Sequence, residues 1–317
     1  RFLIFALIIA LNYISTKSTY SSINDSLLKS NITYGVKISS NNCNFSTFRI
    51  YLPLPSSTEF QHLYSYKTNL QPGLVIYSRE HDAKYLMFKI EKLLNQNKSV
   101  EIIISSIINK KPRDIDFLKI KPKPYKKNSF LYRKYTEEND YIKYSDKRIK
   151  TIINRIKQLP IIEKIKYVFA YTKKAIKEKS IFKGLRKLKD VLDSGTGECS
   201  DYSTYLISVL RGCGIPSRHI IGRVLNSDIN RSWHVWVEFY IEGYGWIPCD
   251  PYYYKKEKSL LGYEPKDYVI LHRDILLPLP VYENIKYMPM LQSYYYFYSG
   301  NNHSHNFKIQ YIWKIEN

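Results

Sequence analysis

The most informative segment reads Gly-Thr-Gly-Glu-Cys-Ser-Asp-Tyr over residues 195–202, and it places Cys199 between a glycine-containing loop and a helix. Apolar residues at helical spacing predict that this helix continues to about Arg211. A thiol at a helix N-terminus lies at the positive end of the backbone dipole, which favours the thiolate. The free N–H groups of the same turn, including that of Cys199, are suited to binding an oxyanion beside the sulfur. Cys199 is therefore the candidate nucleophile.

A nucleophilic thiol needs a base, and His234 is the candidate because it opens a predicted strand. Residues on alternate positions of a strand point to opposite faces. One face carries Val235, Val237, Phe239 and Ile241, and the other carries His234, Trp236, Glu238 and Tyr240. We expect the first set to lie in the core and the second to face the site.

The chain turns at residues 242–245 and returns as a second strand that ends at Asp250. If Tyr240 pairs with Trp246, Asp250 lies opposite Trp236, on the same face as His234 and diagonal to it. A shift of one residue would place the aspartate on the apolar face, which is unfavourable for a charge. The first register is therefore predicted, and in it Asp250 can accept a hydrogen bond from the imidazole and fix its tautomer.

Four segments of the chain together resemble the transglutaminase-like superfamily. They are residues 197–202, 210–218, 234–238 and 245–251. The family pattern is a cysteine that begins a helix, a Leu-Arg-x-x-Gly-Ile-Pro-x-Arg turn, a His-x-Trp strand and a Gly-Trp-x-x-x-Asp strand. The resemblance covers roughly residues 146 to 280 and implies a papain-like α+β core with Cys199, His234 and Asp250 as nucleophile, base and orienting carboxylate. Val235 departs from the small residue that many relatives have after the histidine, but we expect it on the core face.

The rest of the chain predicts a second domain. Short runs rich in β-branched and aromatic residues indicate strands at residues 48–52, 73–77, 84–90 and 99–104. This spacing predicts a small antiparallel β-sandwich over residues 35–125, joined within residues 112–145 to a catalytic domain over residues 146–317. Helical periodicity begins at about residue 146, and the tyrosine run at residues 294–298 predicts a terminal strand. The predicted fold class is α+β, a β-sandwich-like domain followed by a core in which the cysteine-bearing helix packs on an antiparallel sheet.

The N-terminal residues predict a signal peptide or a short apolar leader over residues 1–18. Arg1 precedes an apolar run over residues 2–11, which is the order of a secretory signal and is short for a membrane span. Residues 16–32 have the composition of a linker. We therefore expect a secreted or cell-envelope protein, periplasmic or extracellular, with anchoring by the apolar segment as the alternative and no other integral membrane domain.

Charge and cysteine content exclude some classes of function. The net charge of +21 is spread along the chain, so we expect a solvated basic surface and no nucleic-acid partner. The four cysteines contain no Cys-x-x-Cys pair, which argues against a zinc ribbon or a disulfide framework, and Cys213 and Cys249 are expected in the core. His303 and His305 are expected in an exposed turn and not at a metal. No metal or organic cofactor is implied.

The expected chemistry is attack by the Cys199 thiolate on an amide or peptide carbonyl to give a thioester, which water or an amine resolves. Among the reactions of the family, we favour hydrolysis by a cysteine protease or amidase, with a peptide, a protein or a cell-envelope polymer as substrate. The alternatives are an acyltransferase that cross-links glutamine to lysine and a non-catalytic binding module on the same fold. Trp233 and Trp236 could line a substrate groove or pack the sheet.

Overall fold

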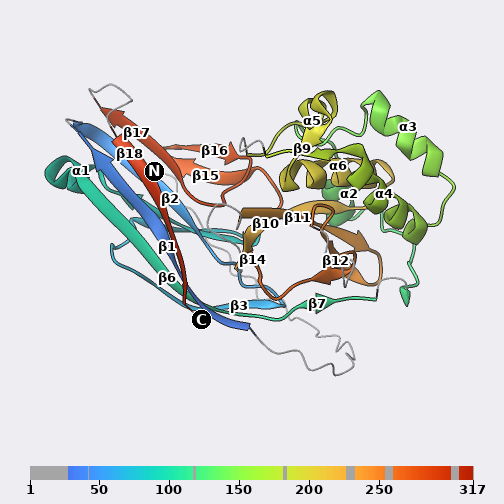
Figure 1. Cartoon of the computed structure of the whole chain (residues 1–317), viewed down its shortest axis with the longest axis horizontal. Helices are drawn as coiled ribbons and strands as arrows, with labels where there is room; N and C mark the ends of the chain where they lie inside the picture. Colours follow the sequence, from blue (N-terminus) through green and yellow to red (C-terminus); the bar gives the residue numbers. More distant parts are fainter. Residues whose placement is uncertain are drawn as a thin grey trace, which may run out of the picture.

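The computed structural model describes residues 28–41, 43–116, 119–180, 184–225, 233–253, 260–300 and 307–316. Figure 1 shows a β-sandwich at the left, a group of helices at the right and a four-stranded sheet between them. This arrangement confirms the predicted α+β class, with a β-rich domain and a core in which a helix packs on an antiparallel sheet. In the described part of the chain, no helix has the length and apolar character needed to cross a membrane.

The sandwich consists of two four-stranded antiparallel sheets. The first contains, in spatial order, β18 (Phe307–Glu316), β1 (Leu28–Ser40), β6 (Ser99–Lys110) and β3 (Gln61–Thr68). The second contains β17 (Tyr295–Gly300), β2 (Phe45–Leu54), β5 (Ala83–Lys89) and β4 (Leu74–Ser78). Alternate residues of β1 and β6 point inward and share one apolar core with β2 and β5. α1 (Glu91–Asn97) connects β5 to β6.

Two features of this sandwich differ from the sequence prediction. β1 begins at Leu28, so the last five residues of the predicted linker belong to a strand. β17 and β18 lie within the predicted catalytic range of residues 146–317, yet they pair with β2 and β1 of the sandwich. The C-terminal end of the chain therefore returns to the N-terminal domain and completes both of its sheets.

The central sheet carries the predicted hairpin. Its strands are, in order, β12 (Gly245–Cys249), β11 (Trp233–Ile241), β10 (Ser217–Val224) and β14 (Tyr268–Arg273). Tyr240 pairs with Trp246, which confirms the predicted register. The predicted core set of β11 lies in the apolar cluster that also holds the buried face of the cysteine-bearing helix.

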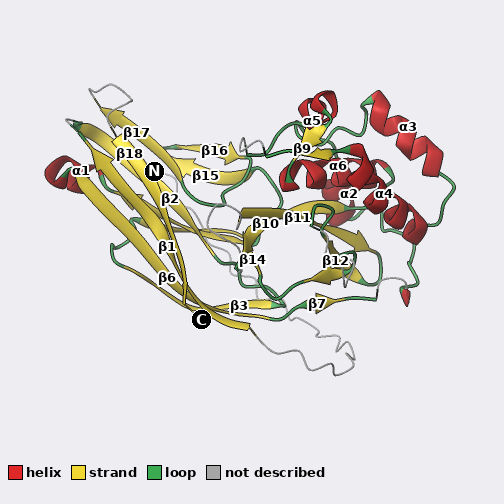
Figure 2. Ribbon diagram, in the orientation of Figure 1, coloured by secondary structure: helices red, strands yellow, loops and turns green. Residues whose placement is uncertain are grey.

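The helices of the core pack together on one side of the central sheet, as Figure 2 shows. They are α2 (Phe130–Thr136), α3 (Lys147–Ile156), α4 (Ile161–Ala175), α5 (Leu188–Ser194) and α6 (Cys199–Gly212). α6 lies at the centre of the group, against β11, and contacts the other four. The start of α6 at Cys199 confirms the predicted position of the cysteine.

Three two-stranded sheets connect these layers. They are β7 (Arg113–Asp114) with β13 (Tyr263–Glu264), β15 (Leu277–Val281) with β16 (Asn284–Met288), and the parallel pair β8 (Lys177–Glu178) with β9 (Thr196–Gly197). The β7–β13 pair joins the chain that leaves the sandwich to a strand of the core. The β8–β9 pair ends directly before the residues that lead into α6.

Candidate active site

The loop before Cys199 is fixed by an ionic and hydrogen-bond clamp. The Asp201 carboxylate accepts a hydrogen bond from the backbone N–H of Glu198 at 2.9 Å. The guanidinium of Arg186 donates to both oxygens of the same carboxylate, at 3.0 and 2.8 Å. A Cβ at Gly197 would lie 2.5 Å from the Cβ of Asp201, so only glycine fits there. The position of the thiol thus depends on the backbone of this loop.

The imidazole of His234 joins the thiol to a buried carboxylate. His234 Nε2 lies 2.6 Å from Asp250 Oδ2, and each residue is only 1% exposed. The Cys199 thiol lies close enough to the same imidazole to raise its pKa. Because Nε2 faces Asp250, Nδ1 is the ring nitrogen left for the thiol. The structure therefore brings the three predicted residues together in the order thiol, imidazole, carboxylate.

The electrostatics of this group favour a charged histidine. Burial is the largest influence on the pKa of His234 and lowers it, but the attraction of Asp250 and Cys199 outweighs burial and raises the pKa to about 10. Burial acts to raise the pKa of Asp250, yet His234 and the other hydrogen-bond donors lower it overall. An imidazolium beside a carboxylate is the result, with a thiol on its other nitrogen.

Asp250 accepts three further hydrogen bonds that the sequence did not predict. The hydroxyl of Tyr268 donates to Oδ2 at 2.8 Å. The backbone N–H groups of Tyr252 and Tyr253 donate to Oδ1 at 2.9 and 3.2 Å. The two backbone donors directly follow Asp250 and form a local turn. Tyr268 comes from β14, and no local pattern in the sequence indicates its contact.

The two tryptophans considered for substrate binding both pack against other side chains. Trp236 is 1% exposed and lies beside His234, with ring centroids 5.6 Å apart and planes 15° apart. Its indole N–H donates to Glu264 Oε2 at 2.9 Å. Trp233 is half-buried and packs on Tyr311, with centroids 5.0 Å apart. Only Trp233 keeps a surface that solvent reaches.

Glu238 lies on the predicted face of β11 but away from the thiol. Its carboxylate contacts the guanidinium groups of Arg113, Arg218 and Arg273, which lie on β7, β10 and β14. These cations lower its pKa in spite of complete burial. The expectation that all four polar residues of this face point toward the site was therefore wrong for Glu238, because guanidinium groups on other strands bind its carboxylate.

Glu178 and Tyr252 form an exposed edge beside the thiol that the sequence analysis missed. The Tyr252 hydroxyl donates to Glu178 Oε1 at 2.7 Å. Glu178 belongs to β8, which pairs with the strand that leads to Cys199. Burial, Glu178 and Cys199 together raise the pKa of Tyr252. The pair joins two segments that flank the nucleophile.

The other described cysteines differ from Cys199 in their surroundings. Burial raises the pKa of Cys213 to about 11 and that of Cys249 well above its ordinary value. Cys249 is 1% exposed and Cys213 packs against the same core, as predicted. Within the described ranges, no group of three or more His, Cys, Asp or Glu side chains could hold a metal ion. His303 and His305 lie outside the described residues.

Comparison with known proteins agrees with this geometry. Residues 150–251 match the family model of the transglutaminase-like superfamily. A Cytophaga hutchinsonii protein described as a candidate cysteine protease has a TM-score of 0.59 at 14% identity, over 91% of each chain. No curated protein matches.

Two more distant structures share less of the fold. LapG of Legionella pneumophila, EGTA-treated, has a TM-score of 0.32 at 14% identity, over 44% of this chain and 78% of its own. A candidate protease of Parabacteroides distasonis has a TM-score of 0.29 at 12% identity, over 70% and 43%. Residues 150–251, which contain Cys199, His234 and Asp250, thus match the transglutaminase-like superfamily, and the Cytophaga structure shares the fold over most of the chain.

Proposed function

We propose that this protein is a cysteine-nucleophile enzyme that hydrolyses amide or peptide bonds through a thioester. The observation that carries the proposal is the position of the buried His234 imidazole between the Cys199 thiol and the buried Asp250 carboxylate. A histidine whose pKa is raised to about 10 holds a proton at neutral pH and stabilises a thiolate beside it.

The reaction begins with attack of the Cys199 thiolate on the substrate carbonyl carbon. The C–N bond then breaks, the imidazolium of His234 gives its proton to the departing amine, and a thioester remains. In the second half, His234 removes a proton from water, the hydroxide adds to the thioester, and the C–S bond breaks to release the acid and the thiolate. The backbone N–H of Cys199, in the first turn of α6, is the proposed donor to the oxyanion.

The proposed substrate is a peptide, a protein or a cell-envelope polymer. Support for an envelope location comes from the order of charge and apolar residues at positions 1–11. The exposed Glu178 and the half-buried Trp233, which directly precedes His234, are the proposed first contacts for substrate. No step of the proposed reaction uses a cofactor.

The experiment is the rate of iodoacetamide labelling at each cysteine across pH, in the wild type and in His234→Ala. We expect Cys199 to react at pH 6, where an ordinary thiol with a pKa near 8.5 is almost entirely protonated, and we expect this reactivity to disappear in His234→Ala. Cys213, whose pKa burial raises to about 11, is the internal control and should react slowly in both proteins.

A wild type in which Cys199 reacts no faster at pH 6 than Cys213 would reject the enzyme and leave a binding module on this fold. If Cys199 is activated, the acceptor is identified with glutamine- and lysine-containing peptides in H2 18O. Hydrolysis adds one 18O to the product, whereas cross-linking joins the peptides without 18O. Cross-linking alone would overturn the proposed hydrolysis and keep the nucleophile.

A further inference from the structure

We propose that the N-terminal β-sandwich takes part in catalysis, with Lys110 as a positioning residue that holds His234 in place through Glu264 and Trp236. This inference rests on the proposed function of Cys199 and His234. It assigns a role to a series of contacts, from Lys110 to His234, that the reaction itself does not use. Each contact is between residues that are nearly or completely buried.

The first contact joins the sandwich to the core. Lys110 is the last residue of β6, and its ammonium forms an ion pair with Glu264 of β13, both side chains being 0% exposed. The chain then continues into β7, where Arg113 pairs in register with Glu264. Arg113 Nη1 also lies 3.7 Å from Glu264 Oε2. The sandwich therefore supplies Lys110 to this carboxylate, and the chain that leaves the sandwich supplies Arg113.

The second contact links Glu264 to the proposed base, His234, through Trp236. Glu264 Oε2 accepts the indole N–H of Trp236 at 2.9 Å. The indole lies nearly parallel to the imidazole of His234, and His234 precedes Trp236 by two residues on β11. The end of the indole also packs on the backbone at Gly222, the residue of β10 that pairs with His234, and an added Cβ there would lie 2.6 Å from Trp236 Cη2. The ring is thus held by a charge at its N–H and by backbone at its far end.

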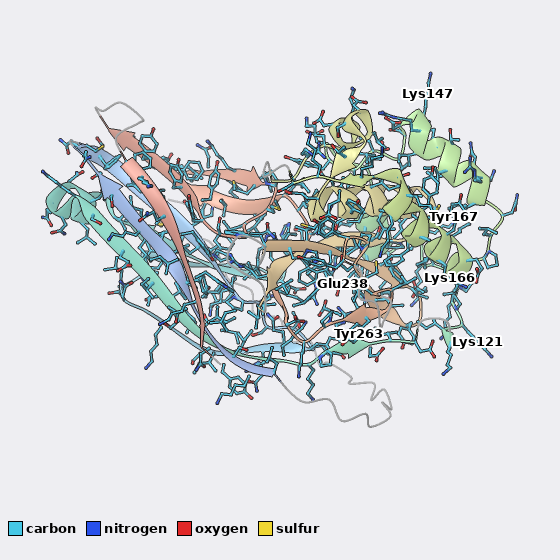
Figure 3. The ribbon with its side chains drawn as sticks, viewed as in Figure 1. Lys121, Lys147, Lys166, Tyr167, Glu238 and Tyr263 are labelled. Carbon is cyan, nitrogen blue, oxygen red and sulfur yellow. The ribbon has the colours of Figure 1, made fainter. Side chains whose placement is uncertain are left out.

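A second buried carboxylate fastens the same strand. Glu238 follows Trp236 by two residues on the same face of β11 and binds Arg113 as well. Glu238 is completely buried, and Figure 3 shows it in the core to the right of the sandwich, with Tyr263 of β13 below it in this view. Arg113 therefore contacts carboxylates on two strands of the core, and Lys110 contacts one of them.

Buried ion pairs are a weak source of stability, because the cost of removing both charges from water offsets most of their attraction. Their directional contacts, however, specify one arrangement of the strands. Catalysis depends on such an arrangement, since a misplacement of about 1 Å in a reacting group can slow a reaction about 100-fold. We infer that this cluster fixes the plane of His234 relative to Cys199.

The test uses the full-length chain with Lys110→Met and measures iodoacetamide labelling of Cys199 at pH 6 and pH 9.5. A misplaced imidazole no longer stabilises the thiolate, so the rate at pH 6 should fall about fivefold or more, whereas the rate at pH 9.5, where the thiol ionises unaided, should change less than about twofold. Trp236→Phe, which keeps a ring and loses the N–H, should give the same change. Lys111→Met, at the exposed neighbouring position, should match the wild type.

Labelling of the buried Cys249 in the same samples reports general loosening of the fold. If Lys110→Met does not fold, Lys110→Met/Glu264→Gln removes both charges and serves in its place. A folded variant with the wild-type rate at pH 6 overturns the inference, as does a variant in which Cys249 becomes reactive while the pH profile of Cys199 is unchanged. If wild-type Cys199 is not activated at pH 6, the proposed function itself fails, so the two failures are distinguishable.

Discussion

Three buried histidines lie on the central sheet, and one of them, His234, differs from the other two in its charge. His234 on β11 has its pKa raised to about 10, whereas His219 on β10 and His272 on β14 have theirs lowered to about 3. All three side chains are 1% exposed or less. Burial is the largest influence on each of them and acts in the same direction, so burial does not explain the difference.

The partners of the ring nitrogens explain it. His234 Nε2 faces a carboxylate oxygen at 2.6 Å. The ring of His219 contacts the hydroxyl of Thr204 at 3.1 Å, and His272 Nδ1 contacts the backbone carbonyl of Asp274 at 3.2 Å. A neutral oxygen does not compensate the loss of water around a cation, whereas a carboxylate does. One carboxylate therefore decides which buried histidine of the sheet is charged.

The largest expected effect is on stability in acid. His219 and His272 have folded pKa values below the unfolded value near 6.5, so their stabilising contribution is complete above pH 6.5 and is lost as the pH falls toward 3. The unfolded chain binds nearly one more proton at each site, and together they should reduce the free energy of unfolding by about 2.4 kcal/mol between pH 6 and pH 5. Urea unfolding at a series of pH values measures this slope.

The matched variant for this slope is His272→Gln. Glutamine offers a donor to the Asp274 carbonyl and an acceptor to the backbone N–H of Leu291, which His272 Nε2 now accepts at 3.0 Å, but it does not titrate. We expect the variant to show about half of the wild-type slope. His234 acts in the opposite sense, because its raised pKa stabilises the fold below pH 6.5 and ceases to do so as the pH rises through about 10. An unchanged slope in His272→Gln would contradict the assignment of neutral histidines.

The next effect tests whether the carboxylate is the cause. Asp250→Asn makes the surroundings of His234 resemble those of His219, so the imidazole should become neutral and the thiolate should lose its counterion. The rate of Cys199 alkylation at pH 6 should then fall about 300-fold, which corresponds to the thiolate fraction of an ordinary thiol with a pKa near 8.5. Asp193→Asn removes a carboxylate on the exposed surface and should leave the rate unchanged. Fast alkylation in Asp250→Asn would show that another group holds the charge.

The sequence predicted the carboxylate and its partner because both belong to one hairpin. Alternation along residues 234–241 and the position of the turn define the pairing of Tyr240 with Trp246, and this pairing alone sets Asp250 beside His234. The position of Cys199 followed from a loop, a helix start and an apolar stripe. Each of these signals spans fewer than about 20 residues, the range over which local periodicity is informative.

The unpredicted parts all depend on contacts between segments far apart in the chain. β18 pairs with β1 across almost the whole sequence, and its alternation says nothing about which sheet it joins. Tyr268 reaches Asp250 from β14, which is separated from β11 by β10. Glu238 has the alternation of a site residue, but its partners Arg113 and Arg273 come from other strands.

The smallest expected effect is the difference in stability contributed by two buried tyrosine hydrogen bonds, one to a carboxylate and one to a backbone carbonyl. Tyr268 donates to Asp250 Oδ2 at 2.8 Å, and Tyr202 donates to the Ile176 carbonyl at 2.7 Å, so both are buried hydrogen bonds of similar length. A bond to a charged group contributes about 1.5–3 kcal/mol and one to a neutral group about 0.5–1.5 kcal/mol. Tyr268→Phe should therefore reduce the free energy of unfolding at pH 7 by about 1 kcal/mol more than Tyr202→Phe, as measured by urea unfolding. Equal losses would mean that the charge of Asp250 is already satisfied by His234 and the backbone, and that Tyr268 only packs beside the pair.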